Sequence, residues 1–255
     1  MNKSVVTFLI VCGVFAGTAG QAAAQGAPWS DRGYINVGWG VESGSSAMTD
    51  TKSFSIYDET GTITSSNTFT SGSLFDVGVG LRVWKNLTVG GAYHQEQNDT
   101  DGTLTASIPS PVFFNRPRSV TETVEGLNRK ESAVHVVLGW VIPFSSKFDV
   151  MVSAGPSFFR LEQEAVNNFL PVAEAGGAFT SVTLTPSRIA RKKSQTGYNA
   201  GVDATYIVWS NDSVRLGAGG FVRFTQASTD VEMLGSAQPT DVGGVQFGFG
   251  GRIRF

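Results

Sequence analysis

The strict alternation of apolar and polar residues at the end of this chain most constrains what it can fold into. From Val245 to Phe255 every odd position except Gly251 is apolar, while the even positions are glutamine, glycine or arginine. A period of two residues is typical of a β-strand with one apolar and one polar face. The same period returns in the segments 35–42, 75–83, 87–96, 133–142, 148–154, 198–208 and 214–224. The sequence therefore predicts an all-β chain of about eight strands.

The strands are expected to cross a membrane. Glycine and phenylalanine are abundant, with 31 and 18 residues among 255. After residue 24 no apolar run approaches the ~20 residues that a membrane-spanning helix needs. A bilayer could then be crossed only by strands, and about eight is the smallest usual number for a membrane barrel. We therefore expect a closed antiparallel transmembrane β-barrel.

The lengths of the connections indicate how this barrel is oriented. Short connections fall near 85–86, 143–147 and 210–212, and long polar ones cover 43–73, 97–131, 162–196 and 226–242. In outer-membrane barrels the short turns are periplasmic and the long loops extracellular. Trp84, Trp140 and Trp209 each lie at or just before a short turn, which predicts an interfacial girdle. The alternative, a soluble or lipocalin-like barrel, would turn its apolar face inward.

The N-terminus has the pattern of a secretory signal peptide. Lys3 is followed by an apolar stretch over 5–16 and by the alanines at 22–24. We expect a signal peptide over 1–24, cleaved before the mature barrel domain at 25–255. The alternative is a retained membrane anchor, for which the apolar run is short.

Composition excludes several kinds of chemistry. The one cysteine, Cys12, lies within the expected leader, so the exported chain has no thiol for a disulfide or for catalysis. The net charge is −2, which gives no indication of nucleic-acid binding. Neither a cofactor nor a nucleic-acid partner is predicted.

The C-terminal strand also carries a family resemblance. A strand that ends on Phe255, with Phe249 and Ile253 at alternate positions before it, resembles the terminal segment of bacterial outer-membrane β-barrels. The resemblance implies that these three residues are the signal read by the barrel-assembly machinery. The mature chain is similar to the small OmpA-type and OmpW-type porin-like barrels, notably over 74–87, 113–118 and 155–159. Membership implies a monomer in the Gram-negative outer membrane, surrounded by lipid and lipopolysaccharide.

The polar face of each strand should line the barrel interior, which side chains fill in a barrel this narrow. Strand direction predicts that Asp76, His94, Glu96, His135 and Arg223 lie toward the extracellular half. It places Arg82, Asp149, Arg215, Arg252 and Arg254 toward the periplasmic half, with Asp203 near the middle. Two interpretations of this lumen polar network remain open: a plug of ion pairs, or a gated path for small solutes.

His94 and His135 raise two further possibilities. They fall on adjacent strands at similar heights, beside Glu96 and Asp76, so zinc binding is geometrically conceivable. Neither a metalloprotease motif nor paired cysteines support it, and no metal site is predicted. Some small outer-membrane barrels modify lipid A through a histidine-activated serine at the rim. The inward phase of both histidines argues against such an enzyme.

The long connections leave the functional class open. Arg188, Arg191, Lys192 and Lys193 form a basic cluster that is either simply solvated or in contact with lipopolysaccharide phosphates. Residues 53–69 read as a hairpin above the membrane. The predicted function is a structural or passive small-solute transport role, with a surface-exposed interaction or adhesion protein as the alternative and a lipid A-modifying enzyme as the third. The sequence identifies neither a substrate nor a partner.

Overall fold

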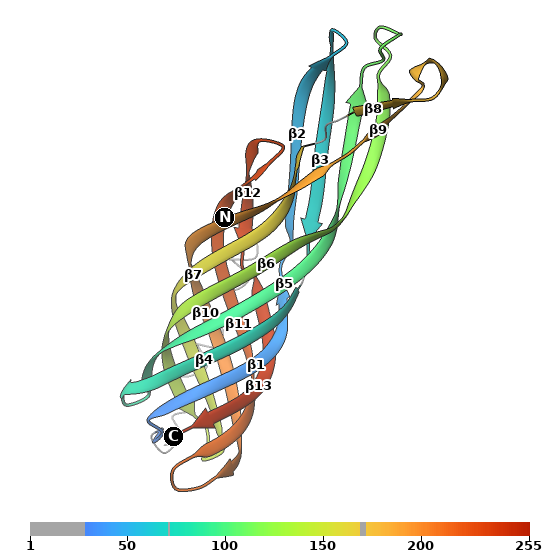
Figure 1. Ribbon diagram of the computed structural model, residues 1–255. Helices are drawn as coiled ribbons and strands as arrows, with labels where there is room; N and C mark the ends of the chain where they lie inside the picture. Colours follow the sequence, from blue (N-terminus) through green and yellow to red (C-terminus); the bar gives the residue numbers. More distant parts are fainter. Residues whose placement is uncertain (1–28, 71, 169–171) are drawn as a thin grey trace.

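The computed structural model describes residues 29–70, 72–168 and 172–255 (Figure 1). The expected signal peptide over 1–24 and the start of the barrel domain at residue 25 lie outside these residues. Within the described part, no helix has the length and mean hydropathy needed to cross a membrane.

The lower part of the molecule is a closed ring of antiparallel strands. Its members are β1 (Gly33–Ser43), β4 (Gly72–Trp84), β5 (Leu87–Ile108), β6 (Arg118–Pro143), β7 (Phe148–Asn168), β10 (Ser187–Ser210), β11 (Arg215–Met233) and β13 (Val245–Arg254). Each strand pairs with the next in this order, and β13 returns to β1 with Tyr34 opposite Arg254 and Ser43 opposite Val245. The predicted closed barrel of about eight strands, with its last strand against the first, is confirmed.

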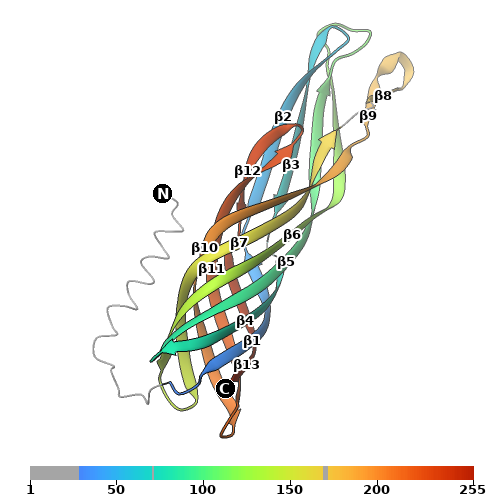
Figure 2. The same cartoon turned by 60° about the vertical axis from the view of Figure 1, so that its left-hand side comes forward.

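Above the ring, the strands continue into a long shaft (Figures 1 and 2). The shaft consists of β2 (Ser46–Ile56), β3 (Glu59–Phe69), β12 (Ser236–Val242) and the upper parts of β5, β6, β7, β10 and β11. A small sheet of β8 (Val172–Ala175) and β9 (Ser181–Leu184), joined through the short helix η1 (Gly177–Phe179), lies near its upper end. The chain ends at the opposite, lower end.

The prediction of long loops over 43–73, 97–131, 162–196 and 226–242 was therefore wrong for most of their length. Most of these residues form strands, and the hairpin expected within 53–69 is the upper part of β2–β3. The reason is a second alternation, hidden in a Ser- and Thr-rich composition, that turns apolar side chains such as Ile63, Leu104 and Val231 into the shaft. Apolar residues inward and polar residues outward are typical of a strand whose outer face is exposed to water.

The two parts of the molecule have opposite faces. In the ring, the apolar residues point outward: Val79 is 50% exposed and Phe249 is 72% exposed. In the shaft, the inward positions are apolar and buried, among them Met48, Ile63, Leu104, Leu127, Leu161, Val231 and Met233. On β5 this change takes place along one inward row, from His94 to Leu104. The outer surface of the ring is therefore suited to contact with lipid, and the outer surface of the shaft to contact with water.

A β-bulge adjusts β6 at the start of the shaft. Thr100 of its partner β5 pairs with Leu127 of β6, and Gly102 pairs with Val124. Two residue steps on β5 therefore match three on β6, so β6 carries one extra residue. Gly126 has a φ of 61°, and its N–H donates to Asp101 Oδ1 at 2.8 Å. The extra residue lets both Leu127 and Val124 point inward, as bulges commonly re-aim side chains.

The shaft, unlike the ring, has a seam. Among the described strands, β2 pairs only with β3, and β12 pairs only with β11. Side chains join the two free edges: Ser46 Oγ lies 3.3 Å from Thr240 Oγ1, and Gln238 Nε2 donates to Asp50 Oδ1 at 3.1 Å. The Ser236 hydroxyl donates to the other oxygen of Asp50.

Replacing Val79 or Val136 with lysine tests the outward phase of the ring. Both side chains are exposed in the apolar belt, so a charge there should lower the free energy of unfolding by ~2–4 kcal/mol in a bilayer. Urea unfolding in lipid vesicles measures this loss. Ser55→Lys, at an exposed position of β2 in the shaft, is the matched control and should change the free energy by less than ~0.5 kcal/mol. Equal effects at all three positions would contradict the lipid-facing assignment.

Candidate functional site in the barrel interior

Ion pairs fill the lower half of the ring. The even positions of β13 point inward, and from there Arg252 makes two hydrogen bonds to Asp203 of β10, Nη2–Oδ2 at 2.9 Å and Nε–Oδ1 at 3.2 Å. One step below, Arg254 Nη2 donates to Asp149 Oδ1 of β7 at 2.9 Å and to Thr205 Oγ1 at 2.8 Å. Both arginines are buried. These pairs join strands that are not neighbours in the ring, so they cross the lumen.

Small residues make room for these long side chains. Gly219 of β11 lies between β13 and β10 in the ring. A Cβ added there would lie 2.3 Å from the Ala204 carbonyl oxygen and 3.1 Å from Arg252 Nε. Arg252 can therefore reach Asp203 only because the strand it passes has no side chain at this point.

A segment before β1 covers the lower end of the lumen. Asp31 is buried and pairs with Arg215 of β11, Oδ2–Nη1 at 2.9 Å. The carbonyl oxygen of Trp29 accepts a hydrogen bond from Arg82 of β4, and the buried Trp29 ring lies 5.5 Å from the Arg254 guanidinium carbon. The guanidinium of Arg254 is thereby enclosed from below.

Another ion pair spans the middle of the ring. Arg223 Nη1 of β11 lies 2.6 Å from Asp76 Oδ2 of β4, on the opposite side of β1 and β13. Below this pair is a small cavity of about 20 Å³, lined among others by Asn36, Asp76, Asp203 and Arg223. Such a volume holds about one water molecule.

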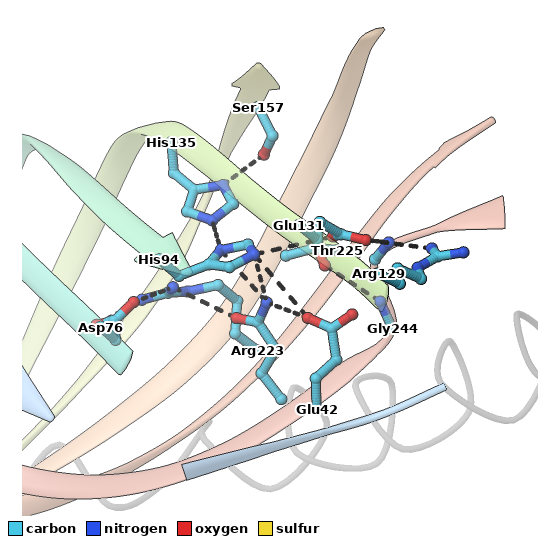
Figure 3. Close-up of polar contacts among 12 residues, drawn as sticks. Glu42, Asp76, His94, Arg129, Glu131, His135, Ser157, Arg223, Thr225 and Gly244 are labelled. Carbon is cyan, nitrogen blue, oxygen red and sulfur yellow. Dashed lines mark hydrogen bonds and ion pairs between the residues drawn. The ribbon is translucent and has the colours of Figure 1, made fainter. Parts of the chain in front are cut away.

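Two histidines form a hydrogen-bonded row beside this pair, with His94 opposite Asp76 in the β4–β5 register (Figure 3). His94 Nδ1 lies 2.6 Å from His135 Nε2, and the rings stack with their centroids 4.8 Å apart. His135 Nδ1 lies 2.7 Å from Ser157 Oγ, which also accepts a hydrogen bond from Asn199 Nδ2 at 2.9 Å. All four side chains are buried. The row therefore runs across β5, β6, β7 and β10, inside the barrel.

Carboxylates meet the free end of this row. His94 Nε2 lies 4.0 Å from Glu42 Oε2 and 3.9 Å from Glu131 Oε1 (Figure 3). Arg129 Nη2 contacts the other oxygen of Glu131 at 3.4 Å. Glu96 lines the same cavity of about 30 Å³ as Glu42, Arg129 and Glu131. Negative side chains thus outnumber the single arginine in a buried space.

The residues predicted from the sequence for the lumen all point into it, and the structure sorts them into separate groups. Asp76 lies opposite His94 in the β4–β5 register, as expected, and its carboxylate pairs with Arg223, whereas Asp149 and Asp203 pair with arginines of β13. His94, His135 and Glu96 lie together near the top of the ring.

Several members of the interior were not predicted: Asp31, Glu42, Arg129, Glu131, Ser157 and Gln246. Glu42 stands on the inward phase of 35–42, so the alternation itself could have identified it. Arg129 and Glu131 fall in the expected connection 97–131. Their inward orientation follows only from the fact that β6 extends from Arg118 to Pro143.

The remaining predicted groups lie on the outer surface. Trp84, Trp140 and Trp209 are exposed at the lower end of the apolar belt, each close to a short turn. On β13 and at the chain end, Phe249, Ile253 and Phe255 also point outward. An upper row of exposed aromatics, Phe75, Tyr93, Phe158 and Tyr198, bounds the belt on the other side. On β4 the stretch between the two rows matches the about 9–11 residues of a tilted transmembrane strand.

The basic cluster at 188–193 lies on strand β10 of the shaft rather than in a loop. Arg191 Nη2 lies 2.9 Å from Glu232 Oε2, and Lys192 Nζ lies 3.0 Å from Glu162 Oε1. Part of its positive charge is therefore neutralised by neighbouring strands, which weakens it as an anion-binding surface.

A second polar cluster joins three hairpins at the upper end. Arg118 Nη2 donates to Glu174 Oε1 at 2.8 Å and to the Pro109 carbonyl oxygen at 2.7 Å, and the Tyr57 hydroxyl donates to the same Glu174 oxygen at 2.9 Å. Hydrogen bonding from Arg118 holds the pKa of Glu174 below its ordinary value. A lowered carboxyl pKa stabilises the folded form at neutral pH, and this contribution is lost as the pH falls through that lowered pKa.

Comparison with known proteins finds solved structures that are similar to this chain. The chain is similar in structure to Neisserial surface protein A (NspA), with 12% identity, a TM-score of 0.41 and coverage of 88% of this chain and 97% of that chain. It is similar to the outer membrane protein OprG from Pseudomonas aeruginosa, with 10% identity, a TM-score of 0.42 and coverage of 91% and 98%. No family model matches the sequence, and no curated protein matches it.

The closed ring, its exposed apolar belt and its polar interior together define the fold class. This is the fold of a small transmembrane β-barrel of eight antiparallel strands. A soluble barrel is excluded, because such a fold would turn the apolar face inward.

Separate and joint replacement of Arg252 and Asp203 tests the cross-lumen pair. Removing either partner leaves a buried charge without compensation, so Arg252→Ala and Asp203→Ala should each lower the free energy of unfolding by about 3–5 kcal/mol. The double variant should lose clearly less than the sum of the two, as expected for residues in direct contact. Urea unfolding in vesicles gives all three values. Additive losses would show that the two side chains do not interact in the membrane.

Proposed function

We propose that this protein is a structural barrel of the bacterial outer membrane, with a sealed lumen, that holds a rigid shaft above the cell surface. In this orientation the short turns and the chain end are periplasmic and the shaft is extracellular. The exposed apolar belt, flanked by aromatic rows on both sides, supports the membrane assignment. Outer-membrane lipid and lipopolysaccharide are its proposed surroundings, and a monomer is its proposed state.

The cross-lumen ion pairs are the observation that carries the sealed-lumen proposal. Arg252–Asp203, Arg254–Asp149 and Arg223–Asp76 cross the interior at successive heights. A fully desolvated arginine is very costly to leave unpaired, so each pair favours the closed arrangement. Above them, the buried apolar core of the shaft adds a second barrier to water. This arrangement supports a structural role over passive transport of solutes.

A lipid-modifying enzyme is not supported. Ser157 and His135 have the spacing of a nucleophile and its base, 2.7 Å between Oγ and Nδ1. Both side chains are fully buried within the ring rather than exposed to the lipid or at the rim. A lipid acyl chain has no route to this serine, so we interpret the pair as part of the packing of the interior.

A surface-exposed interaction role is the second candidate, and the upper tip favours it. Val112, Phe113 and Phe114, in the connection between β5 and β6, are exposed by 53, 50 and 75%. Arg116 lies over the Phe113 ring at 5.9 Å. Exposed apolar groups held far from the membrane are typical of contact surfaces. The hydrogen bonds of Arg118 below them fix the tip in place.

Planar-bilayer recording tests the sealed lumen. Wild-type protein should show no steady conductance, because ion pairs fill the interior at the level of β13. Arg252→Ala should produce leak currents, because it removes the side chain that fills the space over Gly219.

Steady wild-type conductance with a change of ion selectivity in Arg252→Ala would overturn the proposal in favour of a working pore. Silence from both proteins would leave the lumen sealed without Arg252 and would place the function on the shaft and its tip. Val136→Ala, in the apolar belt away from the lumen, is the matched control and should remain silent.

Deleting Phe255 or replacing it with aspartate tests the outer-membrane assignment. If the C-terminal strand is the assembly signal, folded protein in the outer-membrane fraction should fall several-fold, and the precursor should keep its leader cleavage unchanged. Immunoblots of fractionated cells measure both. Phe247→Ala, on the same face but farther from the terminus, serves as the comparison. Normal levels of the Phe255 variants would contradict the assembly role.

A further inference from the structure

Three buried side chains of metal-ligating type converge at the top of the ring (Figure 3). Their ligand atoms, a nitrogen of His94 and one carboxylate oxygen each from Glu42 and Glu131, all lie within 4.8 Å of one another. The three come from β5, β1 and β6, so the closed ring holds them together. We propose that they form a binding site for one divalent transition-metal ion of the zinc type.

An unpartnered oxygen points to a missing ligand independently of this spacing. Glu131 Oε2 accepts hydrogen bonds from Arg129 Nη2 at 3.4 Å and from the Gly243 N–H at 3.2 Å. Its other oxygen, Oε1, is buried and has no hydrogen-bond partner among the described residues. This oxygen lies 3.9 Å from His94 Nε2. A buried carboxylate oxygen without a partner is costly, and a cation between Oε1 and Nε2 would satisfy it.

The spacing needs little adjustment to hold an ion. Zinc bonds of about 2.0–2.2 Å in a tetrahedral site put ligand atoms roughly 3.3–3.6 Å apart. His94 Nε2 lies 3.9 and 4.0 Å from the two carboxylates, so small rotations of Glu42 and Glu131 would close the site. The adjoining cavity of about 30 Å³ provides space for the ion or for a water that completes its coordination.

Hydrogen bonds behind the ligands fix their orientation. An ion on His94 Nε2 leaves the proton on Nδ1, which then donates to His135 Nε2 at 2.6 Å. His135 in turn carries its proton on Nδ1 and donates to Ser157 Oγ at 2.7 Å. Gln246 Nε2 donates to Glu42 Oε2 at 2.7 Å. Ligating histidines are usually held in this way through the second ring nitrogen.

The donor set selects the class of metal. One imidazole nitrogen with carboxylate oxygens suits zinc and its transition-metal neighbours, whereas calcium and magnesium prefer sites of oxygen alone. Charge also favours a divalent ion, because Glu42, Glu96 and Glu131 face a single arginine, Arg129, around the cavity. Ser45 and Thr70, exposed residues of the β1–β2 and β3–β4 connections, line the same cavity, so an ion would enter between these connections rather than through the apolar core of the shaft.

The histidine content makes the proposal testable without interference. The whole sequence has two histidines, both in this row, and its one cysteine is Cys12. Tag-free mature protein, folded in detergent micelles, should bind about one Zn²⁺ per barrel in a calorimetric titration. Co²⁺ should give the visible absorption bands of a low-symmetry site. The Nε2 resonance of one histidine should shift on Zn²⁺ addition in ring ¹⁵N spectra.

Variants separate ligands from supporting residues. His94→Gln and Glu131→Gln should each weaken Zn²⁺ binding by about 100-fold or more, and His135→Gln by about 10- to 100-fold. Glu162→Gln, an exposed carboxylate on the outer face of β7, is the matched control and should bind like the wild type. Migration of the unheated protein on a denaturing gel reports whether each variant is folded.

Unchanged affinity in folded His94→Gln or Glu131→Gln would overturn the site, as would equal weakening by Glu162→Gln. If neither ligand variant folds, the wild-type ring spectra decide. A saturating Zn²⁺ titration that leaves both histidines unshifted would refute the proposal.

Discussion

Closure of β13 on β1 is the constraint on which the rest of the structure depends. A bilayer offers no hydrogen-bond partner to a strand edge, so a sheet in lipid is stable only as a ring. The register from Tyr34–Arg254 to Ser43–Val245 closes that ring, and the Phe255 carbonyl continues it by accepting from the Gly33 N–H at 2.9 Å. Once the ring is closed, each strand has one face toward lipid and one toward a narrow interior. The alternation of side chains follows from this geometry.

The narrow interior explains why its charges are arranged as they are. An arginine on β13 cannot reach water, so it reaches across β11 to a carboxylate on β10 or β7. The missing side chain of Gly219 leaves the space through which Arg252 passes β11. Toward the top, the carboxylates exceed the cations and the histidine row begins. The same closed geometry thus produces a compensated lower half and an uncompensated cluster above it.

Much of the ring could be predicted from sequence because its signal is local. Alternation along 75–83 or 245–255 sets which residues face lipid, independently of any partner strand. The shaft was missed because its apolar positions, such as Ile63 and Leu104, are diluted by serine and threonine, which read as loop residues.

The candidate site was predicted only in part, because its assembly is not local. Glu42 and Glu131 meet His94 through the stagger of three separate strands, β1, β6 and β5. No sequence spacing encodes that stagger. The cover at the lower end, with Trp29 and Asp31, depends likewise on tertiary contacts that a short segment before the first strand does not reveal.

The seam between β2 and β12 gives the shaft a property that the ring lacks. An unpaired strand edge can pair with another chain. Here the edges of β2 and β12 lie against each other, joined by the hydrogen bonds of Asp50 and Ser46 to side chains of β12. These contacts involve side chains alone, so they can separate without breaking a backbone ladder. Above the membrane the molecule is therefore a sheet rolled into a tube and fastened along one line, and any widening of that tube must begin there.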